Sequence, residues 1–123
     1  MVVILLVDDD PQVQVTLTIA LQEAGHEVWC VPDGRQALQQ LRKRSADVVI
    51  TDILMPEVDG LELIRVLRRE FPSMKILAIS GGTARLPGVD ILQLALALGA
   101  DRLLCKPFGH RELLEQTNAL LSR

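Results

Sequence analysis

The chain has 123 residues, of which 49% are hydrophobic and 24% charged, a composition typical of one globular domain with a buried core. Its formal net charge of −3 argues against direct nucleic-acid binding, for which a basic stripe would be expected. The apolar stretches are shorter than the roughly 20 residues of a membrane-spanning helix, and the start of the chain lacks the basic region and cleavage site of a signal peptide, so we expect a cytoplasmic protein without membrane contacts.

Strand patterns and helix patterns alternate five times along the chain. Short runs rich in Val, Ile and Leu predict the strands, and apolar residues at helical spacing predict the helices between them. We expect strands at Val2–Val7, Val28–Val31, Val48–Thr51, Ile76–Ser80 and Leu103–Cys105. The first helix begins at Asp10-Pro11 and is stopped by Gly25, and a short second helix begins near Asp33. The other helices are expected around Leu61–Leu67, ending before Phe71, at Val89–Leu98 and around Leu113–Leu121.

This alternation predicts an α/β fold, a doubly wound parallel sheet with right-handed crossovers and helices on both faces. In such sheets, ligands bind at the carboxyl ends of the strands. Four side chains that could bind a ligand or take part in a reaction fall at or just past those ends: Asp8, Asp52, Ser80 and Lys106. We therefore expect them to converge although they are far apart in sequence.

Asp52 is the residue that folding alone explains least, because a strand disfavours Asp and a buried charge needs partners. A carboxylate can accept a phosphoryl group as an acyl phosphate. Asp8, Asp9 and Asp52 in one pocket would repel one another, so we expect raised pKa values or a bound cation there. Mg²⁺ fits, because it prefers oxygen ligands and bridges carboxylates to phosphate. Asp10, directly before Pro11, is assigned instead to capping the first helix.

Together these features resemble the receiver domain of two-component response regulators. The resemblance rests on Val-Asp8-Asp9, on Asp52 followed by Met55-Pro56 and Asp59-Gly60, on Ser80-Gly81, and on Lys106-Pro107-Phe108. It spans nearly the whole chain and implies a single receiver domain over residues 1–123. It also implies the flavodoxin-like fold with five helices and a five-stranded parallel sheet in the order 2-1-3-4-5.

The resemblance further implies a phosphoacceptor switch of bacterial phosphorelay signalling that catalyses only its own phosphorylation and dephosphorylation. A histidine kinase or histidine phosphotransfer protein would donate a phosphoryl group to Asp52, and the change would regulate a protein whose identity the sequence does not give. Asp8, Asp9, Asp52 and the backbone carbonyl of Leu54 would hold Mg²⁺, with Asp8 acting mostly through water. The Ser80 hydroxyl and Lys106 would contact the phosphoryl oxygens.

The chain departs from the family at two places. Leu103 stands where many receivers carry an aromatic residue that turns inward on activation, which puts a relay through an aromatic rotamer in doubt. The segment after Ser80 is about four residues longer than is common, and we expect residues 81–88 to form a mobile loop that is ordered by phosphorylation.

Both cysteines lie in strand-like segments and are expected to be buried thiols. The strand order of the family would place Cys30 and Cys105 on opposite edges of the sheet, too far apart for a disulfide.

Two other functions stay open. One is a pseudo-receiver, a binding module that works without phosphorylation. The other is a haloacid-dehalogenase-type phosphatase, with Asp8 and Asp10 as an Asp-x-Asp motif, although Gln12 replaces the expected Thr or Val and no acidic pair follows Lys106. Because little follows the last helix, a stand-alone receiver is favoured over one cut from a longer protein, which would look the same.

Overall fold

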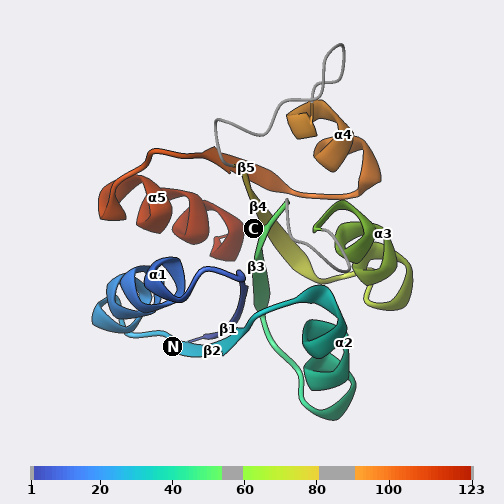
Figure 1. Cartoon of the computed structure of the whole chain (residues 1–123), viewed down its shortest axis with the longest axis horizontal. Coiled ribbons are helices and arrows are strands. Elements are labelled where there is room, and N and C mark those ends of the chain that lie inside the picture. Colours follow the sequence, from blue (N-terminus) through green and yellow to red (C-terminus); the bar gives the residue numbers. More distant parts are fainter. Residues whose placement is uncertain (1, 54–59, 81–90, 123) are drawn as a thin grey trace.

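The central feature is a five-stranded parallel sheet in the order β2-β1-β3-β4-β5, and the strand order implied by the resemblance is therefore confirmed (Figure 1). The computed structural model describes residues 2–53, 60–80 and 91–122. The strands are β1 (Val3–Val7), β2 (Glu27–Val31), β3 (Val48–Asp52), β4 (Lys75–Ser80) and β5 (Arg102–Cys105). Each lies within one or two residues of its predicted position.

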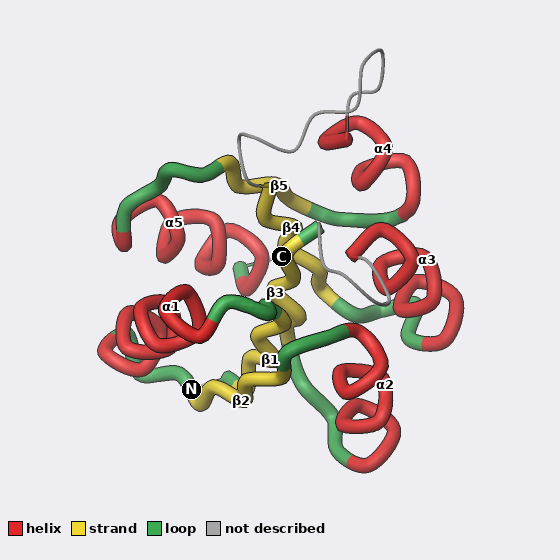
Figure 2. Tube along the Cα trace, in the orientation of Figure 1, coloured by secondary structure: helices red, strands yellow, loops and turns green. Residues whose placement is uncertain are grey.

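Helices cover both faces of the sheet and make a three-layer α/β/α sandwich, as predicted (Figure 2). They are α1 (Pro11–Glu23), α2 (Gly34–Lys43), α3 (Gly60–Glu70), α4 (Ile91–Leu98) and α5 (His110–Leu121). Helices α1 and α5 pack on one face, and α2, α3 and α4 pack on the other (Figure 1). Residues 89–90, predicted as the start of α4, and the loop predicted at 81–88 lie outside the described residues. No helix of the described part is long and apolar enough to cross a membrane.

Alternate residues of the central strands point into two separate cores. In β1, Ile4 and Leu6 belong to the core under α1 and α5, whereas Leu5 and Val7 belong to the core under α2, α3 and α4. All four are fully buried. A strand covered on both faces has no solvent side, which is why its sequence is apolar without a break.

Two aspartates begin helices, as the sequence predicts. The carboxylate of Asp10 accepts a hydrogen bond from the Gln12 amide at 2.9 Å and caps α1. Asp33 accepts one from the Gln36 amide at 2.8 Å and caps α2. Each satisfies an amide that the first turn of a helix leaves without a partner.

One guanidinium ties the ends of α3 and α4 to the sheet. Arg68 donates hydrogen bonds to the backbone carbonyls of Pro72, Met74 and Gly99, and it pairs with Asp101 at 2.9 Å. Asp101 in turn accepts from the Ile76 amide at 2.8 Å. These contacts fix the connections at the amino ends of β4 and β5, opposite the strand ends that carry Asp52 and Ser80.

The prediction of buried thiols is wrong, since Cys30 and Cys105 are both exposed and free. The reason is their position on β2 and β5, the two edge strands of the sheet. An edge strand has a neighbour on one side only, so its side chains are less covered than those of β3, which are all buried. The expectation that the two lie on opposite edges is confirmed.

Candidate functional site

The carboxyl ends of four strands bring the predicted side chains to one edge of the sheet. Asp8 directly follows β1, Asp52 and Ser80 end β3 and β4, and Lys106 directly follows β5. Asp8, Asp52 and Ser80 are 1%, 8% and 9% exposed. These four residues come together because their strands are adjacent and parallel, so that their carboxyl ends share one edge.

Lys106 reaches both buried carboxylates. Its Nζ lies 3.6 Å from Asp52 Oδ2 and 3.8 Å from Asp8 Oδ2. The backbone amide of Lys106 also donates to the Ser80 carbonyl at 2.8 Å, which extends the pairing of β4 with β5 up to the site. The backbone from which the Lys106 side chain extends is therefore anchored to the end of the sheet.

Three carboxylates gather where a metal ion can bind. One carboxylate oxygen from each of Asp8, Asp9 and Asp52 lies within 4.8 Å of the other two. Among the described residues, Asp8 Oδ2 is a buried oxygen without a hydrogen-bond partner. Burial raises the pKa of Asp8, and the nearby Asp52 adds to this effect, while the amide of Asp10 and the charge of Lys106 oppose it.

This donor set fits Mg²⁺. The three ligands are hard oxygens, two of them buried and one exposed, which leaves room for water and phosphate in the remaining positions. A divalent cation would also coordinate Asp8 Oδ2, which has no hydrogen-bond partner among the described residues. Leu54, whose carbonyl is the fourth predicted ligand, lies outside the described residues.

Asp10 does not join the acidic cluster. Its carboxylate is exposed and engaged with the Gln12 amide as the cap of α1. The Asp-x-Asp arrangement of a haloacid-dehalogenase-type phosphatase needs Asp10 at the reaction centre, so this geometry speaks against that alternative.

Gly60 approaches the backbone of the phosphoacceptor candidate more closely than its sequence context predicts. Its amide donates to the Ile53 carbonyl at 2.8 Å. A Cβ on Gly60 would lie 2.0 Å from the carbonyl oxygen of Asp52. The sequence predicted a turn that starts a helix at Asp59-Gly60, but it gave no signal for this close contact, which joins α3 to the end of β3.

Leu103 occupies the position where many receivers have an aromatic residue. It is half-buried in β5 and packs against the core that α2, α3 and α4 cover. Its side chain therefore fills apolar space in that core.

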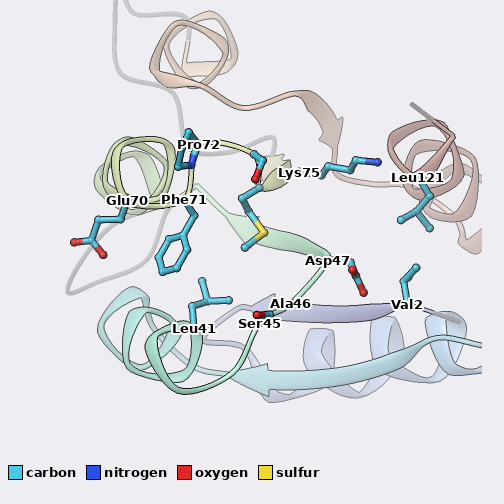
Figure 3. Close-up of a pocket in the computed structure, with 12 residues that line it drawn as sticks. Val2, Leu41, Ser45, Ala46, Asp47, Glu70, Phe71, Pro72, Lys75 and Leu121 are labelled. Carbon is cyan, nitrogen blue, oxygen red and sulfur yellow. The ribbon is translucent and has the colours of Figure 1, made fainter.

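A cavity of about 690 Å³ lies at the opposite end of the sheet, near the amino ends of the strands (Figure 3). Phe71, Leu41, Asp47 and Glu70 are among the residues that line it, and the Glu70 carboxylate points away from the other lining side chains (Figure 3). Both acids are already engaged: Asp47 accepts from the Val3 amide at 2.8 Å, and Glu70 pairs with Arg42 at 2.9 Å.

Comparison with known proteins agrees with this geometry. The family model of the response regulator receiver domain matches residues 4–118. Two curated relatives are 38% identical over 98% of the chain: the DNA-binding response regulator MtrA of Mycolicibacterium smegmatis and the response regulator MprA of Mycolicibacterium vanbaalenii. The chain covers 50% of each of them, so it spans about half the length of these relatives.

Two solved structures are similar to this chain over nearly their whole length. The chemotaxis protein CheY4 of Vibrio cholerae is 33% identical, with a TM-score of 0.86 and 98% of both chains covered. The receiver domain of the Francisella response regulator 1452 is 28% identical, with a TM-score of 0.88 over 100% of this chain and 98% of that one.

Proposed function

The chain belongs to the response regulator receiver domain family, whose members are signalling switches of two-component systems, and we propose that it is a phosphoacceptor switch with Asp52 as the acceptor. The observation that carries this proposal is the meeting of three carboxylates with Lys106 at the carboxyl edge of the sheet. The donor is a histidine kinase or a histidine phosphotransfer protein. A downstream protein binds the phosphorylated domain and is regulated by it.

In the reaction, one carboxylate oxygen of Asp52 attacks the phosphorus of the donor. An acyl phosphate bond forms, and the bond from phosphorus to the donor nitrogen breaks, with its electron pair leaving on that nitrogen. Asp8, Asp9 and Asp52 would hold Mg²⁺, which would supply positive charge to neutralise the transferred group. Most of the catalytic effect is positioning, because phosphoryl transfer requires little covalent work from the protein.

Lys106 and Ser80 bind the product. The Lys106 ammonium already lies within 4 Å of both buried acids, so it can pair with a phosphoryl oxygen after a small movement. The Ser80 hydroxyl, at the end of the neighbouring strand, donates to a second oxygen. Contacts that form only with the phosphoryl group favour one packing of the domain over another. About 5.5 kcal/mol of differential binding moves such an equilibrium from 1:99 to 99:1.

Intact-mass spectrometry after incubation with acetyl phosphate or phosphoramidate and Mg²⁺ tests the proposal. We expect one phosphoryl adduct on the wild type, none when Mg²⁺ is chelated, and none on Asp52→Asn. Asp10→Asn is the matched control, because Asp10 is an adjacent acid that caps α1, and it should keep the adduct. A wild type that gains no adduct and shows no amide shifts with beryllofluoride is a binding module independent of phosphorylation.

A further inference from the structure

We propose that Gln14 is a positioning residue for the metal-binding carboxylates, because its side chain holds the peptide unit that joins Asp8 to Asp9. The inference rests on the proposed function and deepens it, since it assigns a role at the same site to a residue outside the acidic cluster. Gln14 lies on α1, two residues beyond Gln12, and is half-buried.

The contact is a hydrogen bond from side chain to backbone. Gln14 Nε2 donates to the main-chain carbonyl oxygen of Asp8. That carbonyl and the amide of Asp9 belong to one planar peptide unit. A donor that fixes the carbonyl therefore also fixes the direction in which the chain leaves toward the Cα atom and carboxylate of Asp9.

The neighbours of Asp9 have anchors of their own. The Asp8 amide donates to the Val31 carbonyl at 3.2 Å, which continues the pairing of β1 with β2. The Asp10 amide donates to Asp8 Oδ1 at 2.9 Å. Among the described residues, the exposed carboxylate of Asp9 has no hydrogen-bond or ion-pair partner. Its position depends on the backbone, and Gln14 supplies the side-chain contact to that backbone.

The placement of Asp9 matters because a divalent cation must contact oxygens from three separate residues at once. The oxygens of Asp8 and Asp52 are set by two neighbouring strands, whereas Asp9 lies one residue beyond the first of these. Without the Gln14 contact, the peptide unit between Asp8 and Asp9 can rotate and carry the Asp9 oxygen away from the other two. Losing a partner that orients a metal ligand typically weakens metal binding by about 10- to 100-fold.

The chain offers a matched pair of glutamines for the test. Gln14→Met removes the amide but keeps a long, unbranched side chain that suits a helix. The helical hydrogen bond from the Gln14 backbone amide to the Asp10 carbonyl, at 3.0 Å, does not involve the side chain and stays in place. Gln12→Met is the control, because Gln12 is exposed and near the same end of α1, and its side chain makes no hydrogen bond that the structure records.

Two measurements on the full chain without phosphoryl donor decide the question. The first is the Mg²⁺ dissociation constant, from amide chemical shifts during titration. We expect Gln14→Met to raise it by about 10-fold or more, and Gln12→Met to leave it within twofold. The second is hydrogen exchange of the Asp9 amide in chelator, which we expect to speed up in Gln14→Met alone.

The outcomes separate the inference from the proposed function. Wild-type Mg²⁺ affinity and wild-type Asp9 exchange in Gln14→Met overturn the role of Gln14, whether or not Asp52 is phosphorylated. A merely structural role would lower the melting temperature of Gln14→Met and leave the dissociation constant unchanged, which also overturns the inference. A wild type without a phosphoryl adduct overturns the proposed function, and the exchange measurement still tests the contact.

Discussion

Replacing Gly60 with alanine would place a methyl group against the backbone of Asp52, the proposed phosphoacceptor at the end of β3. The added Cβ would lie 2.0 Å from the Asp52 carbonyl oxygen, 2.5 Å from the Ile53 Cα atom and 2.8 Å from the Asp52 carbonyl carbon. All three are backbone atoms, so no side-chain rotation can relieve the contact. The start of α3 and the end of β3 must move apart instead.

The size of this movement sets the expected effects. Non-bonded atoms in ordinary contact lie about 3.5 Å apart, so the separation must open by more than about 1 Å. Overpacking of this kind destabilises a protein by about 1–3 kcal/mol. A displacement of about 1 Å in a catalytic group lowers a rate by roughly 100-fold. We therefore expect Gly60→Ala to lose about 2 kcal/mol of unfolding free energy and to react far more slowly with acetyl phosphate.

Urea unfolding and the rate of phosphoryl adduct formation measure the two effects. Gly109→Ala is the control, because a Cβ there meets only Glu112 Oε1, at 3.9 Å. Its weaker helix cap should lower stability by no more than about 1 kcal/mol and leave the reaction rate unchanged. Wild-type stability together with a wild-type rate in Gly60→Ala would show that the backbone at Asp52 tolerates the methyl group, and the steric reasoning would be wrong.

Three further predictions concern charge, anchoring and exposure. Burial raises the pKa of Asp8 above 3.8, so just above this pH the folded protein retains a proton that the unfolded chain has lost, and the free energy of unfolding falls as the pH rises from about 3.8 through the pKa of the folded state. In chelator at pH 7, Asp8→Asn should therefore have a higher urea midpoint than the wild type. An equal or lower urea midpoint contradicts this account. Arg68→Met leaves the half-buried Asp101 carboxylate without its cation and should lower the unfolding free energy by about 2–3 kcal/mol. A loss below about 0.5 kcal/mol, which is usual for surface substitutions, would rule out an anchoring role for Arg68. Cys30 and Cys105 are free and exposed, so two equivalents of thiol should react with a thiol-specific reagent without denaturant, and a value below two means that one is shielded.

Much of the fold and part of the site follow from short-range sequence signals. Asp10 and Asp33 precede their helices as caps, and this is a local property of an acceptor side chain before a helical pattern. The convergence of Asp8, Asp52 and Lys106 also follows from the sequence, because each ends or follows an apolar run and parallel strands place those ends at one edge. These predictions needed only the order of the elements.

The remaining features depend on distances between segments that the sequence does not encode locally. Gly60 contacts Asp52 only because α3 begins against the end of β3. Gln14 looks like any polar residue of an amphipathic helix until α1 is packed and its amide meets the Asp8 carbonyl. Cys30 was misjudged for a related reason, since an apolar run shows that a segment is a strand but does not show which of its faces an edge position leaves open.

The site is built where the sheet can tolerate unfavourable charge. Strands β1, β3 and β4 are almost fully buried along their length, and the apolar area that they remove from water stabilises the fold. That surplus offsets the cost of holding Asp8 without a hydrogen-bond partner for one oxygen and beside Asp52. A cation that relieves this repulsion therefore binds the folded site with a free energy that the unfolded chain cannot supply, and cation occupancy becomes coupled to stability. In the proposed switch, the same coupling would let a charge change at Asp52 shift the balance between two packings of the domain.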